Sequence, residues 1–423
     1  MANPRLSSAK IIQKILEDKV FFSDLKKQIS ENDLPFCNML ILTVLRHLTA
    51  LQQILGSYLA KKIPNKHRIA QYLLWAAIAE ILYMETAEYA VINETVKNIR
   101  DSSDKFFGGL ANAILRKVCA QKNILRDTAD KISPLPDTFL SILEEYDSEQ
   151  IRQINKAVFA VPALDITTKE NPRELAEKMN AQLLPNGSLR IRNASKVQTL
   201  PEYTSGQWWV QDVAAALPVA VMGEIRGKKV ADLCAAPGGK TAQLAAKGAK
   251  VTAFDISAER MNTLRQNMLR LGFQNIKTYI TDAIEYLHDA SEQFDAVLLD
   301  DPCSAPGTFR RHPEILHIKN RQDAIEQAEL QKSLLELCAN ILKINGILVY
   351  SVCSICKLEG ERQIDSFLHN NPRFKLLPIT ENEISAYGKW QNCLILPNGT
   401  IRTLPYYQNG MDSFFICKMQ RII

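Results

Sequence analysis

The sequence lacks the features of a secreted or membrane-spanning chain. Its 423 residues include nine cysteines, and an odd number at wide spacings does not fit a disulfide framework, so we expect reduced thiols. Residues 1–10 contain no apolar run of the kind that directs export. The most hydrophobic window, residues 69–84, contains Gln71 and Glu80 and is too short to cross a bilayer. We therefore expect a cytoplasmic protein with no membrane partner.

Two common nucleotide-binding patterns are also missing. The phosphate loop of nucleotide triphosphatases needs a glycine where this chain has Cys234, and no G-x-G-x-x-G fingerprint is present. Instead an apolar run leads into Gly238 and Gly239 and then a helical pattern, and a backbone bare of side chains lets a ligand approach closely. Asp255 ends the next apolar run. This pattern predicts an adenosine ligand without a pyrophosphate.

Charge and periodicity divide the chain into three predicted domains. The net charge is +5, and the basic excess lies mainly in the first third, where apolar residues recur at three- and four-residue intervals. We predict an all-helical domain at residues 1–130, whose charge suggests a polyanionic partner, with a merely solvated surface as the alternative. Pro134 and Pro136 mark a boundary. Residues 131–220 are predicted to form a linker helix over 137–158 and a small α+β accessory subdomain.

The third predicted domain, residues 221–423, alternates strands with helices. Strand-like segments lie at 230–233, 251–254, 277–280, 294–299 and 346–352. The alternation predicts an α/β fold with an open, mostly parallel sheet and ligand sites at the carboxyl ends of its strands. Asp255, Asp282 and Asp300 follow three of these strands. Each carboxylate alone is equally consistent with a helix cap, but together they outline an adenosine pocket.

Two thiols follow neighbouring predicted strands. Cys303 comes just after Asp300, and Cys353 follows the last strand, so both are expected to face one cleft. Two thiols at one cleft favour nucleophilic catalysis. The rival interpretation is that Cys353 and Cys356 form a redox or zinc pair, but no second pair or histidine stands at ligand spacing, and we expect no metal.

Four motifs together resemble the signature of the NOL/NOP2/Sun family of S-adenosylmethionine-dependent RNA cytosine-C5 methyltransferases. They are Asp-Leu-Cys-Ala-Ala-Pro-Gly-Gly-Lys (232–240), Asp-Asp-Pro-Cys-Ser (300–304), Arg-Arg-His-Pro (310–313) and Val-Cys-Ser (352–354). With a helical, NusB-like domain in front, the order of parts is similar to the bacterial 16S ribosomal RNA methyltransferases of the RsmB/Sun (Fmu) type over nearly the full chain. Residues 209–212 and 410–415 add to the similarity.

The resemblance implies a Rossmann-like class I methyltransferase domain that uses S-adenosyl-L-methionine. By motif, the cofactor-binding residues would be Cys234, Ala235, Ala236, Pro237, Gly238, Gly239, Lys240, Asp255, Asp282 and Asp300. The substrate-binding residues would be Arg310, Arg311 and His312, with no metal.

The resemblance also implies the catalytic roles. Cys353 would be the nucleophile that adds to C6 of cytosine, Asp300 would hydrogen-bond the ring, and Cys303 would assist product release. The thiolate is needed because its addition turns C4–C5 into an enamine that can take the methyl group. The implied partner is small-subunit ribosomal RNA before full assembly, and we expect a monomer.

Several positions depart from the family pattern. The departures are Asp301 for alanine, Val352 and Pro306 for threonine, His317 for tryptophan, Asp165 for arginine, and Lys357-Leu-Glu359 for a Pro-Glu-Glu run. Asp301 either raises the pKa of a neighbouring thiol or points to solvent. His317 puts base stacking at that position in doubt.

Three alternatives stay open at this point. One is a DNA cytosine methyltransferase that uses Cys303 as nucleophile, although a Glu-Asn-Val element is absent. Another is a non-catalytic RNA-binding factor built around the basic helical domain. The last is methylation of another RNA, such as tRNA.

Overall fold

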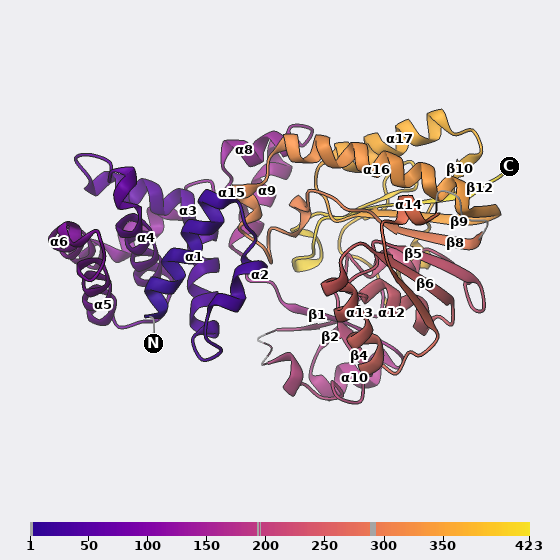
Figure 1. Ribbon diagram of the computed structural model, residues 1–423, viewed down its shortest axis with the longest axis horizontal. Coiled ribbons are helices and arrows are strands. Elements are labelled where there is room, and N and C mark those ends of the chain that lie inside the picture. The colour runs from indigo at the N-terminus through magenta and orange to yellow at the C-terminus, as the bar shows by residue number, and fades with distance from the viewer. Residues whose placement is uncertain (1–2, 193, 195, 288–292) are drawn as a thin grey trace. The chain divides into compact units, whose positions relative to one another are not determined.

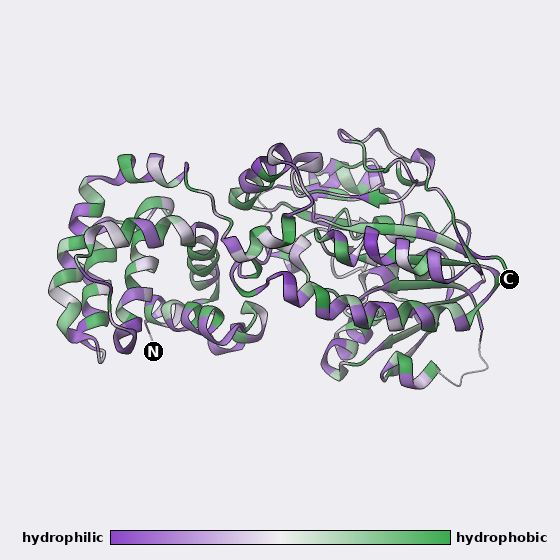
Figure 2. Ribbon diagram, turned by 90° about the horizontal axis from the view of Figure 1, so that it is seen from above, coloured by the Kyte–Doolittle hydropathy of each residue, from purple (hydrophilic) through white to green (hydrophobic). Residues whose placement is uncertain are grey.

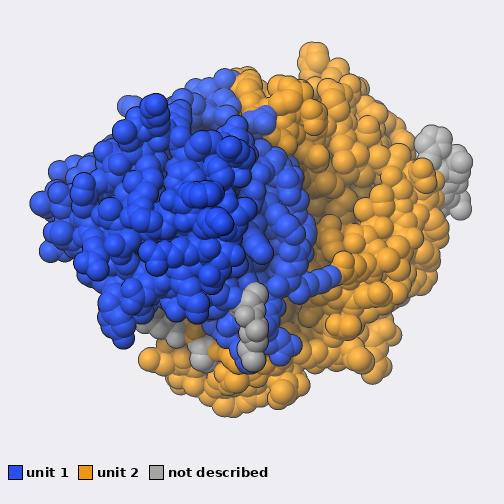
Figure 3. Space-filling view, turned by 60° about the vertical axis from the view of Figure 1, so that its left-hand side comes forward, with its two compact units in different colours: residues 1–159, 309–320 blue, residues 160–308, 321–423 orange. Residues whose placement is uncertain are grey.

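A computed structural model describes residues 3–192, 194, 196–287 and 293–423 and divides the chain into two compact units. The helical unit comprises residues 1–159 and 309–320, and the sheet unit comprises residues 160–308 and 321–423 (Figure 3). The division shows that a short segment from the carboxyl-terminal half of the sequence packs with the amino-terminal helices.

The helical unit has a core of aliphatic side chains between long helices. Its helices are α1 (Pro4–Asp18), α2 (Phe22–Leu25), α3 (Leu34–Tyr58), α4 (Arg68–Tyr83), α5 (Glu88–Arg100), α6 (Gly108–Ala120), α7 (Lys122–Ala129), α8 (Asp137–Leu140), α9 (Ser148–Phe159) and α15 (Ile315–Ile318). Within the described residues, α3 is the one helix long and apolar enough to span a membrane, and half of its most apolar window is buried inside the protein. Its buried face, including Leu40, Val44 and Leu51, belongs to the core shared with α1 and α4.

The helical unit extends beyond the boundary expected at residue 130. The expected helix over 137–158 is broken into α8, a 3-10 turn at Ser141–Leu143 and α9, because residues 144–147 form a turn. Phe139 of α8 packs edge-on against Phe309 at 5.8 Å between ring centroids. This contact explains how the segment 309–320 joins the helical unit.

The accessory subdomain is a four-stranded sheet with one helix. Its elements are β1 (Leu164–Thr168), α10 (Pro172–Met179), β2 (Gln182–Leu183), β3 (Leu189–Ile191) and β4 (Trp208–Val210). The strand order is β2-β3-β1-β4, with all pairs antiparallel. Asp165 forms a two-pronged ion pair with Arg190, whose guanidinium also donates to the carbonyls of Gln408 and Gly410. Asp165 therefore ties this sheet to the carboxyl-terminal loop.

The larger sheet has the predicted open α/β topology. Its elements are α11 (Leu217–Ala220), β5 (Lys229–Leu233), α12 (Gly239–Ala246), β6 (Lys250–Asp255), α13 (Ala258–Arg270), β7 (Ile276–Ile280), α14 (Ala283–Leu287), β8 (Phe294–Asp300), α16 (Arg321–Ile341), β9 (Leu342–Val352), α17 (Glu361–Asn370), β10 (Phe374–Leu376), α18 (Glu381–Ile384), β11 (Ile401–Arg402) and β12 (Phe415–Arg421). The order is β10-β12-β9-β8-β5-β6-β7, with β11 paired to β12. Strands β5 to β9 run parallel, and β12 runs antiparallel to β9.

Helices cover both faces of this sheet (Figure 1). Helices α14, α16 and α17 pack on one face through residues such as Leu335 and Ile364, and α12 and α13 pack on the other through Leu244 and Leu264. The helices in Figure 2 carry both hydrophobic and hydrophilic residues, as expected for elements with one buried side. Because β5, β6 and β8 are buried on both faces, they read as apolar runs, which is why their positions were predictable.

Candidate active site

The turn between β5 and α12 leaves open backbone at the sheet edge. Cys234 and Gly238 both have a left-handed conformation, with φ of 59° and 101°. A Cβ added at Gly238 would lie 2.8 Å from Leu264 Cγ, so glycine is needed there for its conformation and for close packing. A Cβ added at Gly239 would make only ordinary contact with Gln211. Helix α12 begins at Gly239, so its first N–H groups face the turn without partners in the helix.

Asp255 and Asp282 end the two strands beside this turn. Asp255 is 3% exposed, and its two oxygens accept from the N–H groups of Ala236 (3.1 Å) and Ser257 (2.9 Å). It therefore shapes the Cys234–Lys240 turn from the side. Asp282 is half-buried, and its carboxylate accepts from the N–H of Ile284 at 2.8 Å. Each has the capping bond expected of a strand-end carboxylate and retains further lone pairs for a ligand.

Asp300, at the end of β8, is held by one cation and one hydroxyl. Lys240 Nζ lies 2.7 Å from Asp300 Oδ2, and Ser351 Oγ donates to Oδ1 at 2.9 Å. The Lys240 side chain is 9% exposed and the Asp300 side chain 31%, so the carboxylate is the solvent-facing member of the pair. Lys240 therefore orients Asp300.

The two predicted thiols meet at the ends of β8 and β9. Cys303 Sγ and Cys353 Sγ lie 3.0 Å apart, and both cysteines are free and partly buried. The hydrogen bond to Cys353 and burial raise the pKa of Cys303 well above its ordinary value. Either sulfur can donate in this contact. The adjacency predicted from sequence is a consequence of β8 and β9 being parallel neighbours.

The backbone around Cys353 has little freedom. Gly307 donates its N–H to the Cys353 carbonyl at 3.1 Å, and Ser413 donates its own N–H to the Gly307 carbonyl at 2.9 Å. A Cβ added at Gly307 would lie 2.1 Å from the Ser413 oxygen and 2.8 Å from the Cys353 oxygen. Arg402 donates to the carbonyl of Ser354. Cys353 is therefore fixed by chain segments before and after it.

Sequence reasoning missed the side chain that joins the two thiol loops. Glu359 has no exposed surface, and it accepts from Ser304 N (2.8 Å), Ser304 Oγ (2.7 Å) and Ser354 Oγ (2.5 Å). Gln331 of α16 donates to it at 3.3 Å and to the Pro302 carbonyl at 3.0 Å. The repeated Cys-Ser pair, at 303–304 and 353–354, was the available signal for a shared acceptor.

Two buried aspartates beside the site lack full hydrogen bonding. Asp301 is 4% exposed and neither carboxylate oxygen has a partner, so it does not point to solvent; burial and the charges of Asp300 and Glu359 raise its pKa well above its ordinary value. Asp232 accepts from Thr241 Oγ1 at 2.6 Å through one oxygen while the other has no partner, and burial raises its pKa to about 7.

The predicted substrate-binding residues lie in the segment that packs with the helical unit. Arg310 is 3% exposed, and its carbonyl accepts from Arg46 at 2.8 Å. Arg311 is exposed, and His312 is half-exposed with Nδ1 3.6 Å from Glu314. A substrate can reach the side chains of Arg311 and His312 more readily than that of Arg310.

His317 takes part in packing within the helical unit. It is partly buried, and its Nε2 lies 2.7 Å from the carbonyl of Leu45. Burial lowers its pKa to about 4, so the ring is neutral near pH 7 and donates through Nε2 to this carbonyl. A ring fixed in this way does not serve as a stacking surface for a base.

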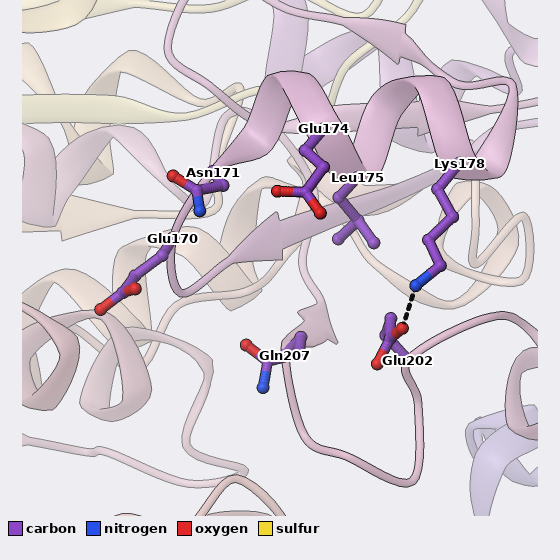
Figure 4. Close-up of a pocket in the computed structure, with 7 residues that line it drawn as sticks. All are labelled: Glu170, Asn171, Glu174, Leu175, Lys178, Glu202 and Gln207. Atoms are coloured by element: carbon purple, nitrogen blue, oxygen red, sulfur yellow. Dashed lines mark hydrogen bonds and ion pairs between the residues drawn. The ribbon is translucent and has the colours of Figure 1, made fainter.

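One cavity in the sheet unit lies away from these groups. It has a volume of about 260 Å³, and its lining includes Glu170, Glu174, Lys178 and Glu202 (Figure 4). Lys178, on α10, points across to Glu202 and forms an ion pair with it. None of the strand-end carboxylates or thiols lines this cavity, so its chemistry is separate from theirs.

The sheet edge fits an adenosine-containing cofactor. The first N–H groups of α12 are without partners in the helix, and Asp255, Asp282 and Asp300 supply acceptors along three strand ends. S-adenosylmethionine carries such an adenosine and supplies an electrophilic methyl group when bound.

Comparison with known proteins identifies both units. The NusB family model matches residues 2–120, and the model for 16S rRNA methyltransferase RsmB/F matches residues 221–420. Ribosomal RNA small subunit methyltransferase B of Pasteurella multocida (strain Pm70) is 30% identical over 447 residues, which cover 100% of this chain and 97% of that protein. The protein of the same name from Photorhabdus laumondii is 30% identical over 99% of both chains.

Solved structures show the same fold. The crystal structure of PH0851 has a TM-score of 0.77 at 22% identity and covers 100% of both chains. NSun6 from Pyrococcus horikoshii, solved with SFG, has a TM-score of 0.59 at 17% identity and covers 68% of this chain and 98% of that one. The predicted fold class and the predicted family are confirmed. Because relatives at 30% identity span the whole sequence, the chain belongs to the RsmB/F family of S-adenosylmethionine-dependent 16S rRNA methyltransferases.

Proposed function

We propose that this enzyme transfers a methyl group to C5 of a cytidine in 16S ribosomal RNA through a covalent bond between Cys353 and C6. The observation that carries the proposal is the pair of free thiols 3.0 Å apart at the strand ends that also hold Asp300. The relatives' names supply the substrate class, since they are ribosomal RNA small subunit methyltransferases.

The reaction requires a nucleophile because C5 of cytosine is too electron-poor to attack a methyl group. The thiolate of Cys353 forms a bond to C6, and the electron pair of the C5–C6 double bond makes C5 nucleophilic. C5 takes the methyl group from bound S-adenosylmethionine. Loss of the C5 proton to a base then restores the C5–C6 double bond as the C6–S bond breaks and sulfur leaves as a thiolate.

The remaining residues take supporting roles in this proposal. Asp300 hydrogen-bonds the cytosine ring and Lys240 keeps its carboxylate oriented, as the 2.7 Å ion pair supports. Cys303 accepts the C5 proton, for which its position beside Cys353 is suitable. The backbone of Cys234–Lys240, with Asp255 and Asp282, holds the cofactor. Arg311 and His312 contact the RNA, and the target base must leave its stack to reach the thiols.

Further expectations concern the setting of the reaction. We infer that the basic helical unit contributes phosphate contacts, which would make RNA binding weaken with salt. We also infer that the enzyme acts as a monomer in the cytoplasm on ribosomal RNA before full subunit assembly.

Replacement of single cysteines tests the proposal. Cys353→Ala should abolish transfer of labelled methyl groups from S-adenosylmethionine to a small-subunit ribosomal RNA transcript, because it removes the proposed nucleophile. Cys393→Ala, which changes an exposed cysteine, is the matched control and should retain activity. If Cys353→Ala stays active while Cys303→Ala does not form any adduct, the nucleophile is Cys303, as in the DNA-type alternative. Sequencing of bisulfite-treated product RNA identifies the modified cytidine.

A further inference from the structure

One buried carboxylate connects the loops that carry the two thiols. We propose that Glu359 is a positioning residue that fixes the position of Cys303 relative to Cys353. With both thiols held, release of the methylated base is not slower than methyl transfer. The inference rests on the proposed function and extends it to a residue that touches neither substrate nor cofactor.

The contacts of Glu359 are divided between the two loops. Ser304 follows Cys303 and donates through both its N–H and its hydroxyl, while Ser354 follows Cys353 and donates through its hydroxyl. Each serine is thus one residue away from a thiol. Because both serines bond the same carboxylate, neither loop can shift without moving or losing a bond to the other.

Glu359 is fully buried, and its hydrogen bonds offset the cost of removing its carboxylate from water. A buried carboxylate is costly unless it is well hydrogen-bonded, and this one has four donors from three residues but no cation within ion-pair distance among the described pairs. Burial raises its pKa, and the serine and Gln331 hydrogen bonds oppose that rise. Tyr350 also donates its hydroxyl to the Glu359 carbonyl at 2.6 Å, which fixes the backbone.

The step that needs this fixed relative position is product release. After methyl transfer, the thiolate form of Cys303, whose own proton has gone to solvent, takes the C5 proton. The C5–C6 double bond reforms, and the C6–S bond breaks to leave the thiolate of Cys353. Cys303 must therefore reach C5 while Cys353 is still bonded to C6, the neighbouring ring atom. Attack by Cys353 places no such demand on Cys303. Loosening the link between the loops should therefore slow release more than attack.

Glu359→Gln tests this inference with little change in side-chain size. Each carboxylate oxygen of Glu359 accepts from two donors, so replacing either oxygen with an amide nitrogen leaves two donors without their acceptor. We expect steady-state turnover on a small-subunit ribosomal RNA transcript to fall about 10- to 100-fold, the range expected for a small misplacement of reacting groups. We expect the first turnover, measured by rapid quenching, to fall much less. Covalent protein–RNA complex should accumulate and be visible on a denaturing gel.

Matched variants separate this role from a structural one. Glu336→Gln makes the same chemical change at an exposed position of α16 and should leave turnover and adduct level unchanged. If Glu359→Gln lowers the first turnover as much as the steady state and traps no adduct, the positioning role is wrong. If Glu359→Gln does not fold, Ser304→Ala removes a single hydroxyl donor and should still trap adduct; equal losses in both phases would again contradict the role. Activity of Cys353→Ala would instead overturn the proposed function itself.

Discussion

Two buried carboxyl groups of the helical unit are fully paired, whereas two in the sheet unit are not. In the helical unit, Glu80 and Asp104 have no exposed surface, and both oxygens of each are bonded. Arg5 donates to both oxygens of Glu80 at 2.6 and 2.8 Å, and Asp104 is bonded by His67 and by the N–H of Ala70. In the sheet unit, Asp232 and Asp301 are equally buried but have oxygens without partners. The fully paired carboxyl groups of Glu80 and Asp104 stabilise the fold, whereas the incompletely paired ones of Asp232 and Asp301 lie beside the proposed active site.

One buried carboxyl group of the helical unit, that of Glu314, is also incompletely paired. Glu314 is 1% exposed and its Oε2 has no partner, and it belongs to the segment 309–320 that comes from the methyltransferase part of the sequence. Buried polar groups without partners cost stability. Asp232 and Asp301 carry this cost beside the cofactor turn and the thiol loops.

The largest stability effect should come from breaking the buried pair in the helical unit. Arg5→Met leaves the charge of Glu80 buried without a partner, and we expect unfolding free energy to fall by about 3–5 kcal/mol. Urea denaturation followed by circular dichroism measures this. Arg152→Met removes a cation from an exposed pair and should cause no measurable change. A loss no larger than that of the control would break the comparison.

Removal of the cation from the Lys240–Asp300 ion pair of the sheet unit should lower activity rather than stability. Lys240→Met frees Asp300, whose carboxylate is already partly hydrated, so we expect a small change in melting temperature. Methyl transfer should fall about a hundredfold because the carboxylate loses its fixed orientation, as for other preorganised polar groups in active sites. Lys343→Met breaks an exposed pair with Asp295 in the same unit and should retain activity. A large loss of stability with full activity in Lys240→Met would contradict this assignment.

Removal of an unpaired carboxyl group should stabilise the sheet unit. The raised pKa of Asp301 means that its contribution is most favourable below the ordinary pKa of aspartate and is lost as pH rises toward the folded-state pKa. Asp301→Ala should therefore raise the unfolding free energy near neutral pH by about 1–3 kcal/mol, the cost of an unsatisfied buried polar group. The gain should shrink as pH falls toward about 4.

Denaturation of the Asp301 variants across pH checks this sign. Asp301→Asn keeps the side-chain volume without titrating, so its stability relative to the wild type should change with pH in the same direction as that of Asp301→Ala. A gain that grows as pH falls would show that Asp301 is charged and stabilising in the folded protein.

The smallest effect should come from a helix cap in the sheet unit. Ser257 accepts from the N–H of Arg260 at 3.3 Å at the start of α13, and Ser257→Ala should cost about 1 kcal/mol. Its backbone N–H, which Asp255 needs, is retained, so methyl transfer should not change. Asn3→Ala at the start of α1 should cost more, because Asn3 also donates to Glu94 at 2.7 Å. The reverse order in thermal denaturation would contradict the stated contacts.

The sequence predicted the sheet more accurately than the connections around it. Strands such as β5 and β8 are continuous apolar runs with both faces buried, so composition alone marks them. The prediction of a single linker helix over 137–158 was wrong. The turn at residues 144–147 that interrupts it contains no glycine or proline to mark it in the sequence. The packing of Phe309–Asn320 with the amino-terminal helices was invisible because the partners lie far apart in the chain.

The sequence by itself determined the helical and α/β character of the two units, the family, the cofactor turn and the order of acidic and thiol residues along the chain. Periodicity and motif spacing are local properties, and each of these features is encoded within a short segment. Only the tertiary structure decided that Lys240 holds Asp300, that Asp301 is buried and that Glu359 bonds both thiol loops. Such contacts depend on which strands become neighbours, because hydrogen bonding and desolvation act through space between segments that are distant in sequence.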